Sequence, residues 1–380
     1  MRVYIDGIIY SLQKIGGVAR YTDELIAGLV NSGHHVTVIM HPHPLYYPNL
    51  HTNLEIISIK PLIPINGKLF NNINHIYSKF WIERYFLKNK IKEGVFHNTY
   101  LTSYNRLKIP QIITIHDMTL EKFPDSFSSF NKVKSKLIHK IIDRAIETTN
   151  AIICYSQQTK NDLLLYHKVT NRDKINVVYL GVSSTFKMYG DTEKETFRKS
   201  NHLTKPYFFY IGTRLAYKNF NKVLEAFSTW KEKDNFSLVT TGGGAFNDIE
   251  RKSIQDLGLT QNIVNLTLST EKDIVMLYNC ADALVFSSIS EGFGLPLVEA
   301  MACGTPILAS DIPVFREIAR DVPYYFNPHD ASSIVSMLNN SLVKDEMKIT
   351  AGIKRADDFS WKNMVDQTIE IYKKLDLKNI

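Results

Sequence analysis

Two glutamates mark the stretch SEGFGLPLVEAMACGTPILAS, residues 290–310: Glu291 lies in a glycine-rich turn, and Glu299 lies early in the helix expected to follow. Pro296 suits the first turn of that helix, and glycines let a backbone approach a ligand closely. A helix N-terminus offers amide groups and a dipole that favour an anion. A carboxylate beside an anion is useful as an acceptor for hydroxyl groups, such as those of a sugar. The pattern therefore predicts two glutamates that bind sugar hydroxyls on either side of a phosphate.

Each glutamate alone also has a simpler interpretation. Glu299 could only complement the helix dipole, and Glu291 could be a solvated loop residue. The backbone amides around Phe293, Gly294 and Leu295 are the groups expected to face the anion.

A second loop carries two cations, Arg214 and Lys218, in YIGTRLAYKNFNKVLEAF, residues 210–227. A guanidinium fork and an ammonium point charge together suit a diphosphate. Two surface cations flanking a helix start are the alternative.

Three further loops offer weaker signals. Gly16 and Gly17 lie between a predicted strand and helix, where they could cradle a phosphate or form a plain tight turn. Their spacing fits neither GxGxxG nor GxxxxGK[ST]. His116 ends a predicted strand, where it could donate to a sugar hydroxyl or be structural. Gly244, in TGGGAFND, could lie near a nucleotide base, whereas HPHP at 41–44 is interpreted as a loop rather than a metal site.

Composition narrows the class of protein. The 380 residues are 44% hydrophobic and 22% charged, with a net charge of +7, which is typical of a globular protein with ample core. No apolar window is long enough to span a membrane, and the N-terminus predicts a strand rather than a signal peptide. Three cysteines without a CxxC pattern indicate reduced thiols in a cytoplasmic protein. Nucleic acid is not an expected partner because no binding motif accompanies the positive charge.

The elements that must position these residues follow from hydrophobic periodicity. Strand-like runs alternate with helical segments from RVYID to the last helix. One such series precedes residues 181–206, and a second series follows them. Such alternation predicts parallel sheets joined by right-handed crossovers, and two series predict two doubly wound α/β domains. In such sheets ligands bind beyond the carboxyl ends of the strands, where all the loops above are expected to lie.

A basic amphipathic segment, FNKVKSKLIHKIIDRAIE, residues 130–147, places basic residues on one helical face and apolar residues on another. The basic residues are Lys132, Lys136, Lys140 and Arg144, and the apolar ones are Val133, Leu137, Ile138, Ile141 and Ile142. This face could contact anionic lipid headgroups or only solvent. The aromatic residues nearby that support a lipid-linked acceptor are Phe80, Trp81, Tyr85, Phe86, Phe127 and Phe130.

Taken together, EGFGLPLVEAMACGTPILAS, GTRLAYKNF, GGVARY, TIHD and FSWKNMVDQTIEIYKKL resemble the signature segments of retaining glycosyltransferases of the GT-B-fold family 4. The resemblance covers most of the chain. It implies two Rossmann-like domains facing a central cleft: an acceptor domain, 1–185; a linker, 186–205; a nucleotide-sugar domain, 206–358; and a C-terminal helix, 359–380, that packs back on the first domain. Tyr217 departs from the family, which frequently has Arg there.

The resemblance also implies roles for residues. Arg214 and Lys218 would hold the donor diphosphate with backbone amides, Glu299 would bind ribose, Glu291 would bind the donor sugar, and His116 would contact the transferred sugar. The implied catalytic residues are His116, Glu291, Arg214 and Lys218. The implied substrate-binding residues are Gly16, Gly17, Arg214, Lys218, Gly244, Asn262, Val264, Glu291, Gly292, Phe293, Gly294, Leu295 and Glu299.

The expected activity is therefore transfer of a hexosyl group, with retention and without metal or other cofactor, from a nucleoside diphosphate sugar to an acceptor hydroxyl. A GDP-mannose-like donor and a glycan or polyprenyl-linked acceptor in bacterial surface polysaccharide synthesis are favoured, at the inner face of the cell membrane. A sugar phosphorylase, an epimerase, and a non-catalytic nucleotide-sugar-binding scaffold remain alternatives.

Overall fold

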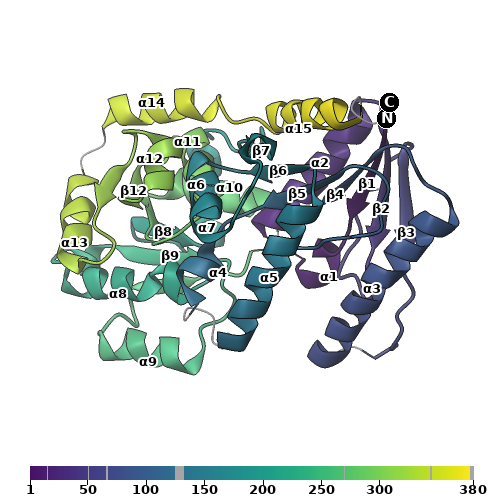
Figure 1. Ribbon diagram of the computed structural model, residues 1–380. Helices are drawn as coiled ribbons and strands as arrows, with labels where there is room; N and C mark the ends of the chain where they lie inside the picture. The colour runs from purple at the N-terminus through teal and green to yellow at the C-terminus, as the bar shows by residue number, and fades with distance from the viewer. Residues whose placement is uncertain are drawn as a thin grey trace. The chain divides into compact units, whose positions relative to one another are not determined.

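The computed structural model describes residues 1–14, 16–49, 51–65, 67–124, 132–268, 270–342 and 345–376, which form two α/β domains (Figure 1). The N-terminal domain comprises the described parts of 1–122, 130–181 and 361–380. The C-terminal domain comprises those of 182–360, together with Phe123 and Pro124. None of the described helices is both long and apolar enough to cross a bilayer.

The N-terminal domain is built on a seven-stranded sheet in the order β3-β2-β1-β4-β5-β6-β7, with parallel pairings throughout. Its strands are β1 (Arg2–Asp6), β2 (His35–Met40), β3 (Leu54–Ser58), β4 (Val95–Asn98), β5 (Gln111–Ile115), β6 (Ala151–Cys154) and β7 (Ile175–Val177). Its helices are α1 (Ile9–Leu12), α2 (Gly17–Asn31), α3 (Lys68–Lys88), α4 (Thr119–Lys122), α5 (Lys132–Thr148), α6 (Gln157–Tyr166) and α15 (Trp361–Asp376).

The C-terminal domain has a six-stranded parallel sheet in the order β10-β9-β8-β11-β12-β13. Its strands are β8 (Tyr207–Ile211), β9 (Ser237–Thr241), β10 (Ile263–Asn265), β11 (Ala283–Phe286), β12 (Ile307–Ser310) and β13 (Tyr324–Phe326). Its helices are α7 (Asp191–Ser200), α8 (Phe220–Thr229), α9 (Asp248–Asp256), α10 (Glu271–Cys280), α11 (Leu295–Ala302), α12 (Pro313–Ala319), α13 (Ala331–Asn340) and α14 (Glu346–Ala356), with the 3-10 turn η3 (Ala216–Lys218) before α8.

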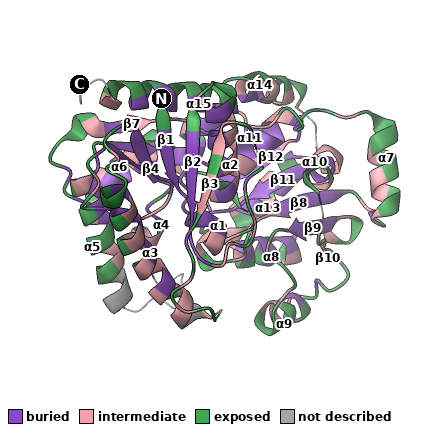
Figure 2. Cartoon of the chain, turned by 90° about the vertical axis from the view of Figure 1, so that its right-hand side faces the viewer, coloured by how far each residue is buried: buried purple, intermediate pink, exposed green. Residues whose placement is uncertain are grey.

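The central strands of both sheets are buried (Figure 2), as the continuous apolar runs of a sheet covered on both faces require. In each sheet the chain order reverses beside the first strand: at β1/β4 in one domain and at β8/β11 in the other. The loops that leave these two neighbouring strands diverge, and this is where doubly wound sheets bind ligands. The predicted α/β architecture with two Rossmann-like domains is confirmed.

The boundary between the domains differs from the expected linker, 186–205. The chain enters the C-terminal domain at Val182, and α7, inside that linker, packs on α10 of the same domain. The Tyr189 amide donates to Asn279 at 2.8 Å, and Arg198 donates to the carbonyl oxygen of Cys280 at 3.4 Å. Hydrophobic periodicity did not reveal α7, because its sequence is polar and none of its residues is buried.

Helix α15 belongs to the N-terminal domain and lies along α2 (Figure 1). A Cβ added to Gly28 of α2 would lie 2.4 Å from a methyl carbon of Val365, so the helices meet at a residue without a side chain. Farther along, the hydroxyl of Tyr372 lies 2.5 Å from Nδ1 of His97 on β4. Close packing and a buried hydrogen bond therefore hold the last helix on this domain.

We predict that Gly28→Ala lowers the free energy of unfolding by about 1–2 kcal/mol, because overpacking against Val365 outweighs the gain in helix propensity. In a Val365→Ala background the same change should be neutral or stabilising, since the added methyl group then has room. Urea denaturation of the four proteins in this double-mutant cycle measures the coupling. Equal effects in both backgrounds would contradict the proposed contact.

Candidate active site

An ion pair joins the two loops that diverge at the switch point of the C-terminal sheet. Nζ of Lys218, in the loop after β8, lies 2.5 Å from Oε1 of Glu291, in the loop after β11. Ser288 donates to the same carboxylate oxygen at 2.7 Å. Both charged side chains are largely but not fully buried, with 17% and 14% exposed. The structure thus brings together one cation and one of the two predicted glutamates.

Local hydrogen bonds fix these two loops to each other. The Ser287 hydroxyl donates to the carbonyl oxygen of Lys218 at 2.9 Å, and the Ile289 amide donates to that of Tyr217 at 2.8 Å. Asn219 ends η3 with a φ of 60°, which turns the chain into α8. The backbone, and not only the ion pair, therefore sets the position of the Lys218 ammonium group.

The signature stretch forms the expected turn and helix. Gly294 precedes α11 with a φ of 97°, and a Cβ there would lie 3.1 Å from Phe315, so glycine is required on both grounds. Pro296 lies in the first turn of α11, and no side chain caps this N-terminus. Phe293 is buried and packs edge-on against Phe359, with ring centroids 5.6 Å apart. The helix terminus is thus held rigidly beside Glu291 and Gly292.

Glu299 lies in α11 and is buried, with 7% of the residue exposed. The hydroxyl of Tyr278 on α10 donates to its Oε2 at 2.8 Å. A purely solvated helix residue would not be backed by a buried phenol, so the carboxylate has a fixed position. Its contact with a ligand stays a prediction.

Arg214 lies in the loop after β8, where it makes contacts that the sequence did not predict, and its contact with a diphosphate stays a prediction. Its Nε donates to Glu250 at 2.7 Å, and its Nη2 lies 3.1 Å from the carbonyl oxygens of Gly243, Gly244 and Ala245. Burial raises the pKa of Glu250, but hydrogen bonds from Arg214 and Asn247 outweigh it and hold this pKa below its usual range. Arg214 therefore orders the glycine loop after β9, and its buried Nη1 has no hydrogen-bond partner among the described residues.

The base-side prediction is wrong for Asn262. This residue precedes β10, at the amino edge of the sheet, and its amide donates to the carbonyl oxygen of Lys233 at 2.8 Å. Val264 lies within β10, whereas Gly244 lies beyond the carboxyl end of β9. Asn265 is the residue at the correct edge, because its amide donates to the Gly244 carbonyl oxygen at 2.9 Å. Its place as the last residue of a strand was the signal that sequence reasoning missed.

In the N-terminal domain, His116 follows β5 and lies among aromatic rings. Its Nε2 lies 2.7 Å from the carbonyl oxygen of Thr99, and the ring centroids of Tyr21 and Tyr155 are 5.9 and 5.1 Å away. Burial lowers the pKa of His116, so the neutral ring donates from Nε2. Nδ1 is then an acceptor, and it has no hydrogen-bond partner among the described residues. In this state the ring can accept a hydrogen bond through Nδ1 but has no free N–H to donate, and its contact with a sugar stays a prediction.

The glycine pair lies where the sequence indicated, between β1 and α2. Gly17 begins α2, and Gly16 precedes it with a φ of 154° and no side-chain cap. No side-chain cap therefore competes with an anion for the first amides of α2. Phosphate binding by this glycine pair stays a prediction.

A buried polar cluster beside β1 was missed. Asp6, fully buried, lies 2.9 Å from Nε2 of His41 and accepts hydrogen bonds from Thr102 and Tyr104 at 2.7 Å. Burial raises the pKa of Asp6, but His41 and the hydroxyls outweigh this and hold it below its usual range. Nδ1 of His41 lies 3.3 Å from Nδ1 of His75. An acid ending an otherwise apolar strand could have revealed this cluster.

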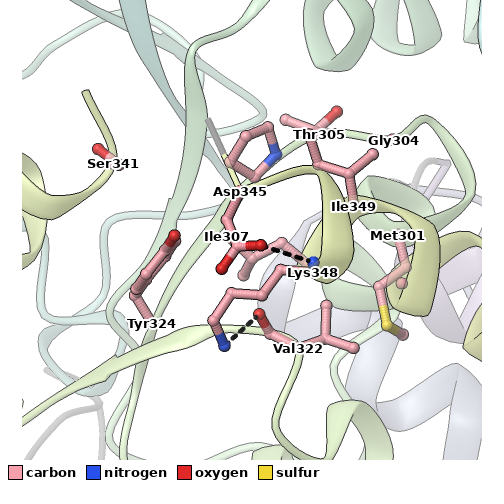
Figure 3. A pocket seen from close by; sticks show the side chains of 12 residues that line it. Met301, Gly304, Thr305, Ile307, Val322, Tyr324, Ser341, Asp345, Lys348 and Ile349 are labelled. Atoms are coloured by element: carbon pink, nitrogen blue, oxygen red, sulfur yellow. Dashed lines mark hydrogen bonds between the residues drawn. The ribbon is translucent and has the colours of Figure 1, made fainter. Parts of the chain in front are cut away.

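A closed cavity of about 10 Å³ lies between α11, α14 and the strands β12 and β13 (Figure 3). Lys348 points its ammonium group at backbone carbonyls there, and Asp345 caps α14. A cavity of this size holds at most a single water molecule, so it is not a substrate site.

Comparison with known proteins shows which family of proteins this chain belongs to. Residues 15–186 match the family model described as Glycosyltransferase Family 4, and residues 191–357 match that described as Glycosyl transferases group 1. Sucrose-phosphate synthase from Thermosynechococcus elongatus has the same fold, with a TM-score of 0.80, 16% identity and 99% of both chains covered. The architecture is therefore GT-B, and the chain belongs to glycosyltransferase family 4.

Two curated relatives are similar in sequence. The O-antigen chain mannosyltransferase RfbU of Salmonella typhimurium is 30% identical over 230 residues, 60% of either chain. The O-antigen chain mannosyltransferase B of Escherichia coli is 25% identical over 291 residues, 75% of either chain. The chain thus spans less than two thirds of the first relative and three quarters of the second.

We predict that Arg214→Ala lowers the free energy of unfolding of the C-terminal domain by about 2–4 kcal/mol, because Glu250 and three carbonyl groups lose a largely buried donor. Lys222→Ala, which removes the partly exposed Lys222–Glu225 pair, should cost about 0–1 kcal/mol. Urea denaturation compares the two. If Arg214→Ala is as stable as the unchanged protein, Arg214 does not hold the glycine loop after β9 in place.

Proposed function

We propose that the protein is a retaining hexosyltransferase that uses a nucleoside diphosphate sugar without a metal ion. The observation that carries this proposal is the Lys218–Glu291 pair at the switch point of the C-terminal sheet, beside the uncapped N-terminus of α11. A cation and a helix terminus suit a diphosphate, and a carboxylate suits the hydroxyls of the attached sugar.

The chemical demand is to stabilise a departing diphosphate and an oxocarbenium-like sugar. Lys218 and the amides of α11 would stabilise the first through fixed charges and dipoles. Glu291 would accept hydrogen bonds from the sugar, Glu299 from the ribose, and His116 would accept one through Nδ1. The bond between the anomeric carbon and the diphosphate breaks, and the bond to the acceptor oxygen forms on the same face. The acceptor proton moves to the departing phosphate.

The names of two relatives support the choice of donor. Two curated relatives are named as O-antigen chain mannosyltransferases, which favours a GDP-mannose-like donor here. The same names favour an acceptor that is a growing glycan, free or polyprenyl-linked, in surface polysaccharide synthesis. Gly244 and Asn265 would lie beside the base, with Arg214 holding that loop in place.

A lipid-linked acceptor implies contact with a membrane, and a surface of the N-terminal domain suits it. On α5 the exposed residues include Lys136, Leu137, Lys140, Ile141 and Arg144, so apolar and basic side chains share one face. The expected segregation of the two kinds onto different faces is therefore wrong for Leu137 and Ile141, which are 57% and 36% exposed. Cations interleaved with apolar side chains suit an anionic interface.

Helix α3 extends the same surface. Ile76 and Phe80 are 62% and 61% exposed, one turn apart. Burial lowers the pKa of Lys79 between them, Glu83 opposes this shift, and the charge of Arg144 on α5 adds to it, so this part of α3 lies within electrostatic range of α5. We define Ile76, Phe80 and the α5 face as the basic–apolar surface. Of the other aromatic residues considered above, Trp81, Tyr85 and Phe86 pack into the core, and Phe127 and Phe130 lie outside the described residues.

We predict that GDP stabilises the protein more than UDP, ADP or dTDP, by about 2.7 kcal/mol at a concentration 100 times its dissociation constant. Lys218→Ala and Glu299→Gln should each weaken GDP binding about tenfold or more and nearly abolish mannosyl transfer, because each removes a charged partner of the donor. Thermal shift and release of GDP from GDP-mannose measure these effects.

Lys231→Ala, at an exposed site of the same domain, is the control and should leave both measurements unchanged. Near-normal transfer in the Lys218 variant would refute the assigned mechanism. A preferred nucleotide other than GDP would overturn only the choice of donor.

We predict that Lys136→Glu with Lys140→Glu weakens binding to anionic phosphatidylglycerol vesicles at least tenfold, since each basic residue near such a surface contributes about 1 kcal/mol. Lys231→Glu with Lys252→Glu makes the same change in net charge on the C-terminal domain and is the matched control. Vesicle sedimentation measures the binding. Equal losses in both variants would show that net charge alone matters, and no loss would remove the membrane hypothesis.

A further inference from the structure

Three side chains of the N-terminal domain, His139, Asp143 and His167, each bring a potential metal ligand within 4.8 Å of the others. His139 and Asp143 lie one turn apart on α5, and His167 follows the last residue of α6. We call these three residues the His–Asp–His cluster. None of them has a role in the glycosyl transfer proposed above.

The geometry of the cluster is specific. Nδ1 of His167 lies 2.8 Å from Oδ1 of Asp143, and Nε2 of His139 lies 3.7 Å from Oδ2 of the same carboxylate. The two imidazole rings are stacked, with centroids 4.2 Å apart. The side chain of His167 is fully buried, whereas those of His139 and Asp143 are 45% and 40% exposed. One ligand is thus fixed, and two can adjust from the solvent side.

A fourth residue, Glu121, lies beside the His167 ring at the nitrogen that faces away from Asp143. Oε1 of Glu121, on α4, lies 3.7 Å from Nε2 of His167, and the Glu121 side chain is only 8% exposed. His167 therefore has one carboxylate at each ring nitrogen. A carboxylate behind a ligating imidazole orients the ring and fixes which nitrogen faces the metal.

We propose that the His–Asp–His cluster binds one divalent transition-metal ion, with Zn²⁺ as the best fit, and that Glu121 positions His167 for it. Two imidazoles and a carboxylate are ligands that Zn²⁺ accepts at about 2.0–2.2 Å. Ligand atoms of a tetrahedral ion at such distances lie about 3.3 Å apart. The two oxygens of Asp143 lie 2.8 Å from Nδ1 of His167 and 3.7 Å from Nε2 of His139, and the three ligand atoms lie within 4.8 Å of one another. Side-chain rotations would bring them to the separation that the ion needs. Ca²⁺ and Mg²⁺ fit less well because they prefer oxygen ligands.

Such an ion would join three helices of the N-terminal domain. It would tie α5 to the end of α6, and through Glu121 to α4, which begins directly after the loop of His116 and Asp117. The site would thus be structural, stabilising the region that carries both His116 and the basic–apolar surface. It is separate in sequence and domain from the Lys218–Glu291 pair, and its test does not depend on transfer activity.

The test is isothermal titration of the full-length, untagged, chelator-treated protein with zinc chloride. The expected result is one ion per chain in the unchanged protein and at least tenfold weaker binding in His139→Gln and in Asp143→Asn. Both positions are half-exposed, so these variants should fold, which circular dichroism checks. His329→Gln, at an exposed histidine of the C-terminal domain, is the control and should bind as the unchanged protein does.

Two further measurements sharpen the result. Zn²⁺ should raise the melting temperature of the unchanged protein and not that of His139→Gln, because only a ligand bound to the folded state stabilises it. Co²⁺ should give the visible absorption of a tetrahedral site in the first protein alone. Absence of stoichiometric binding would overturn the proposal, as would equal zinc affinity in the unchanged protein and both variants.

Discussion

The Lys218–Glu291 ion pair is the constraint on which the candidate site depends. A cation and a carboxylate at 2.5 Å offset each other's charge before any ligand is present, so neither is left uncompensated in a largely buried place. Under the proposed function, a diphosphate would share the cation while the carboxylate accepts hydrogen bonds from sugar hydroxyls. The hydroxyl of Ser287 and the amide of Ile289, which donate to backbone carbonyl oxygens of the other loop, hold the two loops in register. Fixed geometry of this kind lowers the reorganisation needed at the moment of reaction.

The N-terminal domain holds its candidate group by a different device, a chain of buried hydrogen bonds. Tyr372 of α15 contacts His97, whose other ring nitrogen lies 2.8 Å from the hydroxyl of Thr114, and Thr114 in turn lies 3.0 Å from the hydroxyl of Tyr21. Burial lowers the pKa of His97 to about 3, so this chain stays neutral. Because Tyr21 also packs on His116, the C-terminal helix reaches the candidate site through three side chains. The buried hydrogen bonds that begin at α15 therefore help to hold Tyr21, and with it the surroundings of His116, in one position.

The sequence predicted the fold and the signature loop well because both depend on local patterns. Strand–helix alternation requires two parallel sheets, and glycine at position 294 is required by a positive φ that short-range spacing makes recognisable. It did not predict contacts with partners distant in the chain. Nothing near Arg214 shows that its guanidinium will pair with Glu250, and its contact with a diphosphate stays a prediction. Asn262 was misplaced because a strand of three residues, Ile263–Asn265, has boundaries too short for periodicity to locate. Ligand contacts of Glu299 and Gly17 stay predictions.

Helix α5 shows that dividing an amphipathic helix into only an apolar face and a polar face is too coarse. Ile142, Ala145 and Ile146 face the core, while Lys136, Leu137, Lys140, Ile141 and Arg144 are exposed. Between these faces runs a flank, His139 and Asp143, that is neither core nor solvent and that meets the buried His167. Hydrophobic periodicity assigns such a flank to the polar side and so overlooks it. Directional polar contacts on this flank fix the rotation of α5 against the end of α6, which apolar packing, being non-directional, does less sharply.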